Sequence, residues 1–297
     1  MRIVVAERGL QVFAPAKLNL FLEIQGRRPD GYHDLESLML TVDLFDRLEI
    51  AEDPTGAISL HCDDPSLPTD AANLVVQAAE RLKVLTGTSR GASITLSKSI
   101  PAQAGLGGGS SDAAATLTAL NQLWETGVSE DRLDALAGTI GSDVTFFRHA
   151  PAAVCRGRGE RVEPWSLKVP LTFVLVCPPL GSGTADVYRN LNPPERPRPI
   201  GPFLEALTTG ETRAIGQALF NRLQPVAEAL RPPLRTVRDA LLKLVPSCLD
   251  GTLMSGSGSA FFGLAPSPDA AIAAARRLEP LGLGQVRVVR SGPLSSD

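Results

Sequence analysis

Cysteine, histidine and lysine are scarce in this sequence of 297 residues, which has four cysteines, three histidines and five lysines. The cysteines are Cys62, Cys155, Cys177 and Cys248, and their spacings of 93, 22 and 71 residues match no metal-binding or redox pattern. With so few histidines to complete a ligand set, we expect no zinc site. Four thiols without a pairing pattern in a chain of this length indicate a reducing compartment, the cytoplasm.

The sequence also lacks an excess of charge and a long apolar run. Lysine and arginine together number 29 and aspartate and glutamate 32, a net charge of −3, so we expect no nucleic-acid partner. No apolar stretch approaches the length of a membrane span, and the run after Arg2 is too short for a signal peptide. We therefore expect a globular protein without a membrane partner, of a length that suits one large or two ordinary domains.

Glycine, by contrast, is concentrated in residues 101–112, PAQAGLGGGSSD. Alternating polar and apolar residues over 93–98 predict a strand before this stretch. Apolar residues at three- and four-residue spacing from Ala113 to Trp124 predict a helix after it, with Ser110 or Ser111 suited to cap its start. A glycine loop between a strand and a helix N-terminus predicts an anion site, because free backbone amides and the helix dipole both favour negative charge there.

Two common nucleotide-binding loops do not fit this stretch. The P-loop ends in Gly-Lys-Ser/Thr, whereas this loop ends in Gly109-Ser110-Ser111. The dinucleotide fingerprint fails at Ser110, where it requires glycine or alanine, and no early βαβ unit surrounds it. A flexible turn without a ligand is the remaining alternative.

The order Pro-x-x-x-Gly-Leu-Gly-Gly-Gly-Ser resembles the phosphate loop of the GHMP kinases, a family of small-molecule ATP kinases. The resemblance implies an α+β fold of two domains with the active site between them. Residues 1–165 would form a ribosomal-protein-S5-domain-2-like domain and residues 166–297 a ferredoxin-like α/β sandwich. The implied ATP-binding residues of the loop are Pro101, Ala102, Gln103, Ala104, Gly105, Leu106, Gly107, Gly108, Gly109, Ser110 and Ser111.

Residues 14–24, APAKLNLFLEI, alternate in polarity and predict a strand with one buried face. A period of two places Lys17 and Asn19 on the same side of this strand. The pattern alone is equally consistent with a solvated strand face. Because GHMP kinases carry Ala-Pro-x-Lys-x-Asn here, with the lysine in the active site, the resemblance implies a catalytic role for Lys17 and substrate binding by Asn19.

The two tyrosines of the chain both lie in motifs of this family. Asp30-Gly31-Tyr32-His33 follows a turn sequence, and Tyr188 lies in a predicted helix. The alternatives are a surface hairpin for Tyr32 and core packing for Tyr188. One branch of the family acts on a cytidine diphosphate-linked polyol, and the resemblance to that branch implies that Tyr32, His33 and Tyr188 bind the cytosine. Flat rings suit a base, which offers a π-face.

Three further polar residues match family positions. Asn73 opens a predicted helix and Lys98 ends a predicted strand, and the resemblance places both near the adenine of ATP; a helix cap and a solvated strand end are the alternatives. Asp143 lies in Gly141-Ser142-Asp143-Val144, where the family has its catalytic aspartate. It could otherwise simply cap a short helix.

A second glycine-rich stretch, residues 254–263, MSGSGSAFFG, is either a hairpin turn or the family's loop near the phosphates and the acceptor hydroxyl. The resemblance implies substrate contacts from Gly256 and Ser257. Residues 221–224, NRLQ, depart from the Asn-Asp-Leu-Glu of the family, because Arg222 and Gln224 replace two acidic residues. We assign that segment no role from the sequence.

Two local features lie outside these motifs. Residues 1–10 look like a short extension before the first motif, and Asp269 is suited to cap a helix predicted over 270–278.

The chemistry that the resemblance implies is phosphoryl transfer from ATP to the 2-hydroxyl of a methylerythritol unit, a step of the non-mevalonate route to isoprenoid precursors. Asp143 would take the hydroxyl proton, Lys17 would keep Asp143 ionised, and Ser110 or Ser111 would bind Mg²⁺. The alternatives are a mevalonate- or homoserine-type GHMP kinase and a catalytically silent sensor that binds ATP and a sugar-like ligand. We expect a monomer or a weak homodimer.

Overall fold

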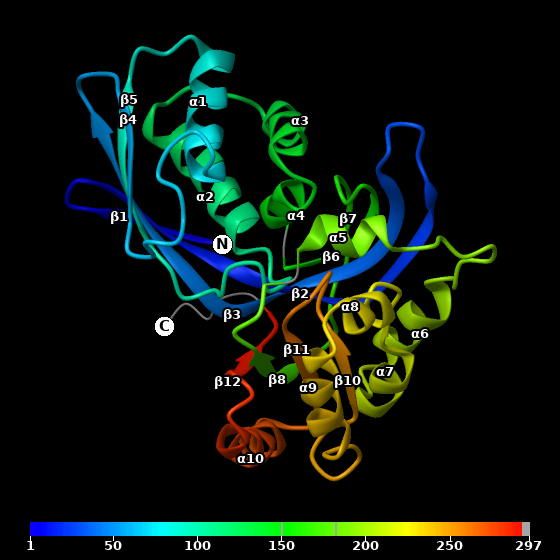
Figure 1. Cartoon of the computed structure of the whole chain (residues 1–297). Helices are drawn as coiled ribbons and strands as arrows, with labels where there is room; N and C mark the ends of the chain where they lie inside the picture. Colours follow the sequence, from blue (N-terminus) through cyan, green and yellow to red (C-terminus); the bar gives the residue numbers. More distant parts are fainter. Residues whose placement is uncertain (150, 182, 293–297) are drawn as a thin grey trace.

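A computed structural model describes residues 1–149, 151–181 and 183–292. The first half of the chain forms a largely antiparallel sheet in which β1 (Arg2–Ala6), β2 (Gly9–Arg27), β3 (His33–Asp53), β5 (Gly91–Ser97) and β4 (Ile58–Cys62) lie side by side in that order. The strand β6 (Ala152–Gly157) pairs with the other end of β3, and β7 (Arg161–Pro164) pairs with β6. The long strands β2 and β3 cross the centre of the molecule (Figure 1).

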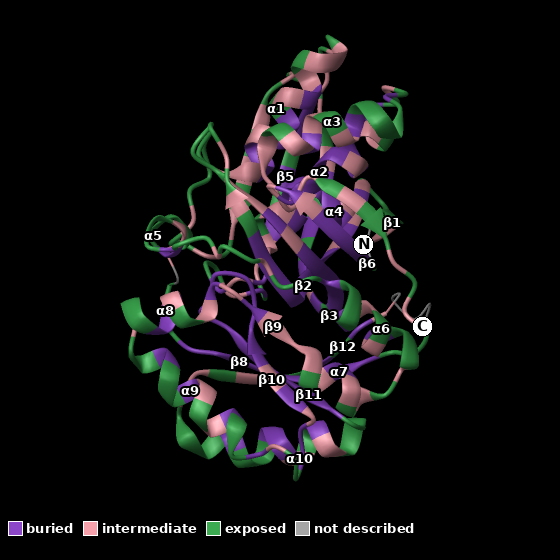
Figure 2. Ribbon diagram, turned by 90° about the vertical axis from the view of Figure 1, so that its right-hand side faces the viewer, coloured by how far each residue is buried: buried purple, intermediate pink, exposed green. Residues whose placement is uncertain are grey.

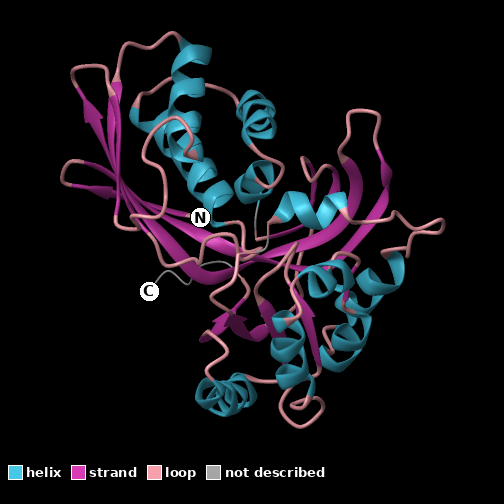
Figure 3. Cartoon of the chain, in the orientation of Figure 1, coloured by secondary structure: helices cyan, strands magenta, loops and turns pink. Residues whose placement is uncertain are grey.

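Four helices cover one face of this sheet: α1 (Leu74–Thr86), α2 (Gly108–Leu123), α3 (Glu130–Ile140) and α4 (Val144–His149) (Figure 3). The helix α2 lies innermost, and its buried alanines and leucines pack against apolar side chains of β2, β3 and β5. Small alanine side chains let the helix lie close to the sheet. Figure 2 shows this interior as a continuous buried region.

The second half forms a smaller antiparallel sheet with the order β10 (Gly251–Met254), β11 (Phe261–Ala265), β8 (Thr172–Cys177) and β12 (Gln285–Arg290). Its helices are α5 (Thr184–Arg189), α6 (Gly201–Thr209), α7 (Thr212–Ala218), α8 (Gln224–Leu230), α9 (Pro233–Leu242) and α10 (Pro268–Leu278), followed by the 3₁₀ turn η1 (Glu279–Leu281). This sheet lies on the opposite side of β2 and β3 from helices α1–α4 (Figure 1).

The two halves share both a core and a strand. One buried cluster combines Leu18, Leu20 and Phe21 of β2 with Phe173 and Phe262 of the second sheet. In addition, the short strand β9 (Phe220–Asn221), from the second half, pairs in parallel with β2. Mixed helix and antiparallel sheet confirms the predicted α+β class.

Three local predictions from the sequence are wrong. Residues 1–10 were expected to be an extension, but they form β1 and a tight turn onto β2, which Gly9 permits with φ +109°. Ser110 and Ser111 do not cap α2, because the helix already begins at Gly108, after Gly107 in the left-handed region. The cap of α10 is Ser267, whose Oγ accepts a hydrogen bond from Ala270 N at 3.2 Å, and not Asp269.

Candidate active site

A cavity of about 1110 Å³ lies where the two halves meet, and residues of both halves line it. Nearly all residues that the sequence singled out are on its wall: Lys17, Asn19, Tyr32, His33, Asn73, Lys98, Pro101, Ala102, Gln103, Ala104, Gly105, Gly107, Gly108, Gly109, Ser110, Asp143, Tyr188, Gly256 and Ser257. Two predicted ATP contacts, Leu106 and Ser111, are buried behind the wall. The fold therefore gathers residues from seven separate stretches of sequence around one space.

Lys17 and Asp143 form the charged centre of the cavity. The strand β2 carries Lys17, whose side chain is buried, and Lys17 Nζ lies 3.6 Å from Asp143 Oδ2. The same ammonium donates a hydrogen bond to Asn19 Oδ1, while Asn19 Nδ2 donates to Ser37 Oγ at 2.9 Å. Asp143 is 26% exposed and immediately precedes α4. The lysine is thus held in place from β2, and the carboxylate remains accessible to a hydroxyl group in the cavity.

The first glycine loop runs directly into the first turn of α2. Gly105 and Gly107 have φ of +77° and +72°, a region that glycine enters without strain. A Cβ at Gly107 would lie 2.8 Å from Phe147 Cζ and 3.0 Å from Lys17 Cγ, so only glycine lets the loop pass so close to the lysine. Ser110 is on the cavity wall, whereas Ser111 Oγ is buried and has no hydrogen-bond partner in the described part of the chain.

The second glycine loop, residues 255–260 between β10 and β11, is fastened to the first. Ser255 Oγ donates to Gly105 O at 2.9 Å, and Ala260 N donates to Ala104 O at 3.0 Å. A Cβ at Gly256 would lie 3.2 Å from Lys17 Nζ, so this loop also passes beside the lysine. The two loops and β2 together enclose Lys17.

Aromatic rings gather at another part of the cavity wall. The rings of His33 and Tyr188 have centroids 5.5 Å apart, although they come from opposite halves of the chain. Burial raises the pKa of the Tyr188 phenol and lowers the pKa of the His33 imidazole, so both rings are neutral near pH 7. Tyr32 is 55% exposed, and the Arg158 guanidinium lies over its ring at 5.0 Å.

Asn73 and Lys98 flank the start of α2. Asn73 caps α1, since its Oδ1 accepts a hydrogen bond from Val75 N at 2.9 Å. Lys98 Nζ is paired with two buried carboxylates, Asp46 and Asp112, and lies 2.8 Å from Asp112 Oδ2. The pKa of Asp112 is raised to about 7, chiefly by burial; Lys98 opposes this rise and the neighbouring Asp46 adds to it.

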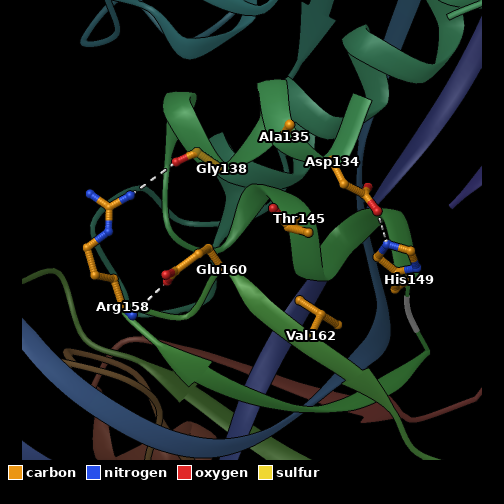
Figure 4. A pocket seen from close by; sticks show the side chains of 8 residues that line it. All are labelled: Asp134, Ala135, Gly138, Thr145, His149, Arg158, Glu160 and Val162. Carbon is orange, nitrogen blue, oxygen red and sulfur yellow. Dashed lines mark hydrogen bonds and ion pairs between the residues drawn. The ribbon is translucent and has the colours of Figure 1, made fainter. Parts of the chain in front are cut away.

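Reasoning from the sequence missed four charged residues of the wall, Arg27, Arg158, Arg189 and Asp112, of which Arg158 and Asp112 make the contacts described here. Arg158 lies in a glycine-rich turn after β6, where its charge was the only signal. Its Nη2 donates to Gly138 O at 3.3 Å, and it also lines a second cavity of about 470 Å³, shown in Figure 4. Asp112 directly follows the glycine loop, but its partner Asp46 is distant in sequence, so no local pattern predicts the pair.

Comparison with known proteins identifies the family. Residues 73–153 match the model of the GHMP kinases N terminal domain, and residues 203–281 match the GHMP kinases C terminal model. The 4-diphosphocytidyl-2-C-methyl-D-erythritol kinase of Pelotomaculum thermopropionicum is 42% identical over 270 residues, 90% of this chain and 93% of that protein. The kinase of the same name from Brevibacillus brevis is 40% identical over 261 residues, 86% of this chain and 87% of that protein.

Solved structures give the same result for the fold. A crystal structure of 4-(cytidine 5'-diphospho)-2C-methyl-D-erythritol kinase has a TM-score of 0.79 at 40% identity, and the match covers 95% of this chain and 100% of that one. The homoserine kinase from Cytophaga hutchinsonii has a TM-score of 0.76 at 21% identity over 98% of this chain and 97% of its own, which shows the fold alone. The chain therefore belongs to the GHMP kinases, and within them to the family of 4-diphosphocytidyl-2-C-methyl-D-erythritol kinases.

Proposed function

We propose that this ATP-dependent kinase phosphorylates the 2-hydroxyl of 4-diphosphocytidyl-2-C-methyl-D-erythritol, in the non-mevalonate route to isoprenoid precursors. The observation that carries the proposal is the Lys17–Asp143 pair, 3.6 Å apart, in one cavity with both glycine loops and the rings of Tyr32, His33 and Tyr188. A phosphoryl donor, a base and a surface for a nucleobase are the three parts that this reaction needs.

The first glycine loop is our proposed site for the ATP phosphates. Its left-handed glycines lead into α2, whose free N-terminal amides and dipole favour anions. Cβ atoms at Gly108 and Gly109 would lie 3.2 Å from Lys98 Nζ and 3.7 Å from Leu74 Cδ1, so Lys98 and the start of α1 border this turn. That position supports binding of the adenine end of ATP beside Asn73 and Lys98.

Asp143 is our proposed general base for the acceptor hydroxyl. A carboxylate that takes the proton as the oxygen attacks the γ-phosphorus raises the nucleophilicity of an otherwise weak alcohol. Lys17, held by Asn19, forms an ion pair with Asp143 and would offset negative charge on the moving phosphoryl group. Asn19, Gly256 and Ser257 border the same space and would contact the polyol.

Mg²⁺ fits this site through Ser110 rather than Ser111. Mg²⁺ in kinases takes few protein ligands and completes its shell with phosphate oxygens and water. Ser110 offers a hydroxyl on the cavity wall, whereas Ser111 Oγ is buried behind it. In the described chain no group of three or more acidic, histidine or cysteine side chains could hold a metal by itself. When bound, the ion would neutralise charge on the phosphates.

The rings of Tyr32, His33 and Tyr188 are the proposed cytosine site. The centroids of the neutral His33 and Tyr188 rings lie 5.5 Å apart, and Tyr32 lines the same cavity with one face under the Arg158 guanidinium. Base–aromatic stacking needs such π-faces, and a mevalonate or homoserine acceptor has no base that would use them.

A coupled ADP-release assay tests the proposed function. The purified protein is given ATP with the cytidylyl substrate, with mevalonate or with homoserine. We expect turnover with the cytidylyl substrate and little with the other two. Preference for mevalonate or homoserine would refute the proposed substrate. ATP binding without ADP release in the presence of any of the three acceptors would support the silent sensor.

We also propose the cytoplasm as the compartment of this protein. The cysteines in the described part of the chain are all unpaired, and burial raises the pKa of the Cys155 and Cys177 thiols, so both stay protonated and unreactive. Unpaired thiols support a reducing compartment, the cytoplasm. None of the helices within the described ranges is long and apolar enough to cross a bilayer.

A further inference from the structure

The segment 220–224, FNRLQ, links the second half of the chain to the strand that carries Lys17. In β9, Phe220 pairs with Phe21 and Asn221 with Leu22, and Arg222 N donates to Leu22 O at 2.9 Å. The segment therefore lies beside β2 a few residues beyond Lys17 and Asn19. The sequence motif at Asn221–Gln224, which departs from the family pattern, had no assigned role.

The amide of Asn221 holds the second glycine loop. Asn221 is 5% exposed, and its Nδ2 donates to both Met254 O and Gly256 O at 2.7 Å. Its Oδ1 accepts from Leu223 N at 2.9 Å, which fixes the orientation of the amide. Gly256 is the residue of that loop whose backbone passes beside Lys17 Nζ.

Arg222 fixes the same segment to β2 through a buried carboxylate. Its Nε and Nη2 donate to Glu23 Oε1 and Oε2 at 2.8 and 2.7 Å, a bidentate pair. The Glu23 oxygens also accept from Ile24 N at 2.7 Å and Arg198 N at 2.9 Å. Burial favours the neutral acid, but these donors outweigh it, so the pKa of Glu23 is lowered and the carboxylate is charged.

We propose that Asn221 and Arg222 are positioning residues for phosphoryl transfer, which hold the second glycine loop in register with Lys17 and Asn19. Arg222 sets where β9 lies along β2, and Asn221 carries that position to the backbone of Gly256. A loop rich in glycine has many alternative conformations, so its place over the lysine depends on such fixed anchors. The inference rests on the proposed kinase function, because it concerns the geometry of that site.

Asn221→Asp is the sharpest test, because it keeps the shape of the side chain and replaces the donor with an oxygen that faces two carbonyls. We expect kcat to fall by about tenfold to a hundredfold, as small misplacements of reacting groups do, while KM for ATP stays within about twofold. A variant with wild-type kcat overturns the role of Asn221.

A matched control for Arg222 exists in the same half of the chain. Arg222 and Glu23 have side chains 32% and 0% exposed, and Arg238 and Glu228 are 31% and 6% exposed. We expect Arg222→Gln and Arg238→Gln both to lower the melting temperature, but only Arg222→Gln to lower kcat per folded molecule. Arg222→Lys, which keeps the charge without the fork, should restore part of kcat. Equal kcat for Arg222→Gln and Arg238→Gln refutes the positioning role.

Hydrogen exchange tests the inference separately from the proposed function. The amides of residues 255–260 should exchange faster in Asn221→Asp than in the wild-type protein and remain unchanged in Arg238→Gln. Unchanged exchange in Asn221→Asp refutes the anchor even if the enzyme is active. If the wild-type protein shows no turnover with any acceptor, the proposed function fails, and faster exchange still supports the anchor.

Discussion

Lys17 and Asp143 are far apart in sequence, and at the residue scale their meeting is the central feature of the site. Lys17 is held by its strand and by Asn19, so its ammonium is kept near Asp143 Oδ2. We predict that Asp143→Asn lowers kcat by about 10²–10⁴-fold, the usual contribution of a general base, and leaves ATP affinity unchanged. Steady-state kinetics and nucleotide titration measure both quantities.

The control for this pair is another lysine. Lys17→Ala should be as damaging as Asp143→Asn, whereas Lys243→Ala, at an exposed position after α9, should leave kcat unchanged. Near wild-type kcat in Asp143→Asn, or equal effects of the two lysine changes, would contradict the assigned roles.

Tyr32 gives a cleaner test of the cytosine site than Tyr188, because it is 55% exposed while Tyr188 packs against the core of the second half. Removal of a stacking ring costs roughly 1–3 kcal/mol per base, about tenfold to a hundredfold in affinity. We predict that Tyr32→Ala raises KM for the cytidylyl substrate by that factor without changing KM for ATP or the melting temperature. A rise in both KM values would show that the ring supports the fold of the cavity instead.

At the scale of elements, the glycine loop and α2 act as one unit. Gly107→Ala places a Cβ against Phe147 and Lys17 at φ +72°, so we predict a loss of about 1–2 kcal/mol in the free energy of unfolding. Gly109→Ala lies inside the helix with only Leu74 near its Cβ, and should gain up to about 1 kcal/mol. Thermal melts measure both changes.

Gly109→Ala also tests phosphate binding. Because Gly109 is on the cavity wall, its new methyl group should weaken ATP binding in a protein that is at least as stable as the wild type. Unchanged ATP affinity in Gly109→Ala would mean that the phosphates lie elsewhere.

The cluster Asp46–Lys98–Asp112 joins β3, the residue after β5 and the N-terminal part of α2. Burial raises the folded-state pKa of Asp112 from 3.8 to about 7, so the folded protein holds that proton more tightly than the unfolded chain. The resulting stability is complete below pH about 4 and is lost as pH rises through about 7. We predict that Asp112→Asn removes this dependence, so that the melting temperature of the variant rises relative to that of the wild type as pH increases from about 4 through about 7. If the curves of melting temperature against pH run parallel for the wild type and Asp112→Asn, the raised pKa of Asp112 is contradicted.

At the scale of the whole molecule, we propose that residues 1–165 and 166–297 are two domains. The end of β7 at Pro164 and the start of β8 at Thr172 support a boundary there. Yet Leu18, Leu20 and Phe21 are buried against the second half, and β9 completes the edge of β2. We therefore predict that a fragment of residues 1–165 lacks the cooperative denaturant unfolding of the full chain. Cooperative unfolding of the fragment with the same midpoint would show that the domains are independent.

Much of the fold and the site was predictable because the information is local. Alternation over residues 14–24 predicts β2, the capping residue Asn73 predicts the start of α1, and glycine spacing predicts the loop before α2. Two of the wrong local predictions have causes outside the local pattern. Residues 1–10 become a strand because β2 lies beside them, and the cap of α2 is Gly107, three residues before Ser110, because Gly107 turns the chain.

The sequence by itself determined the motifs, because these consist of residue types at fixed spacing, and the family resemblance of those motifs implied the α+β class and most of the residues around the cavity. Only the tertiary structure decided which charges meet. Local sequence patterns do not predict which segments come into contact in the pairs Lys98–Asp112, Lys98–Asp46, Arg222–Glu23 and Arg158–Tyr32. The physical reason is that a buried charge needs a partner in space, and the packing of strands and helices, not their order along the chain, sets which partner lies within a few ångströms.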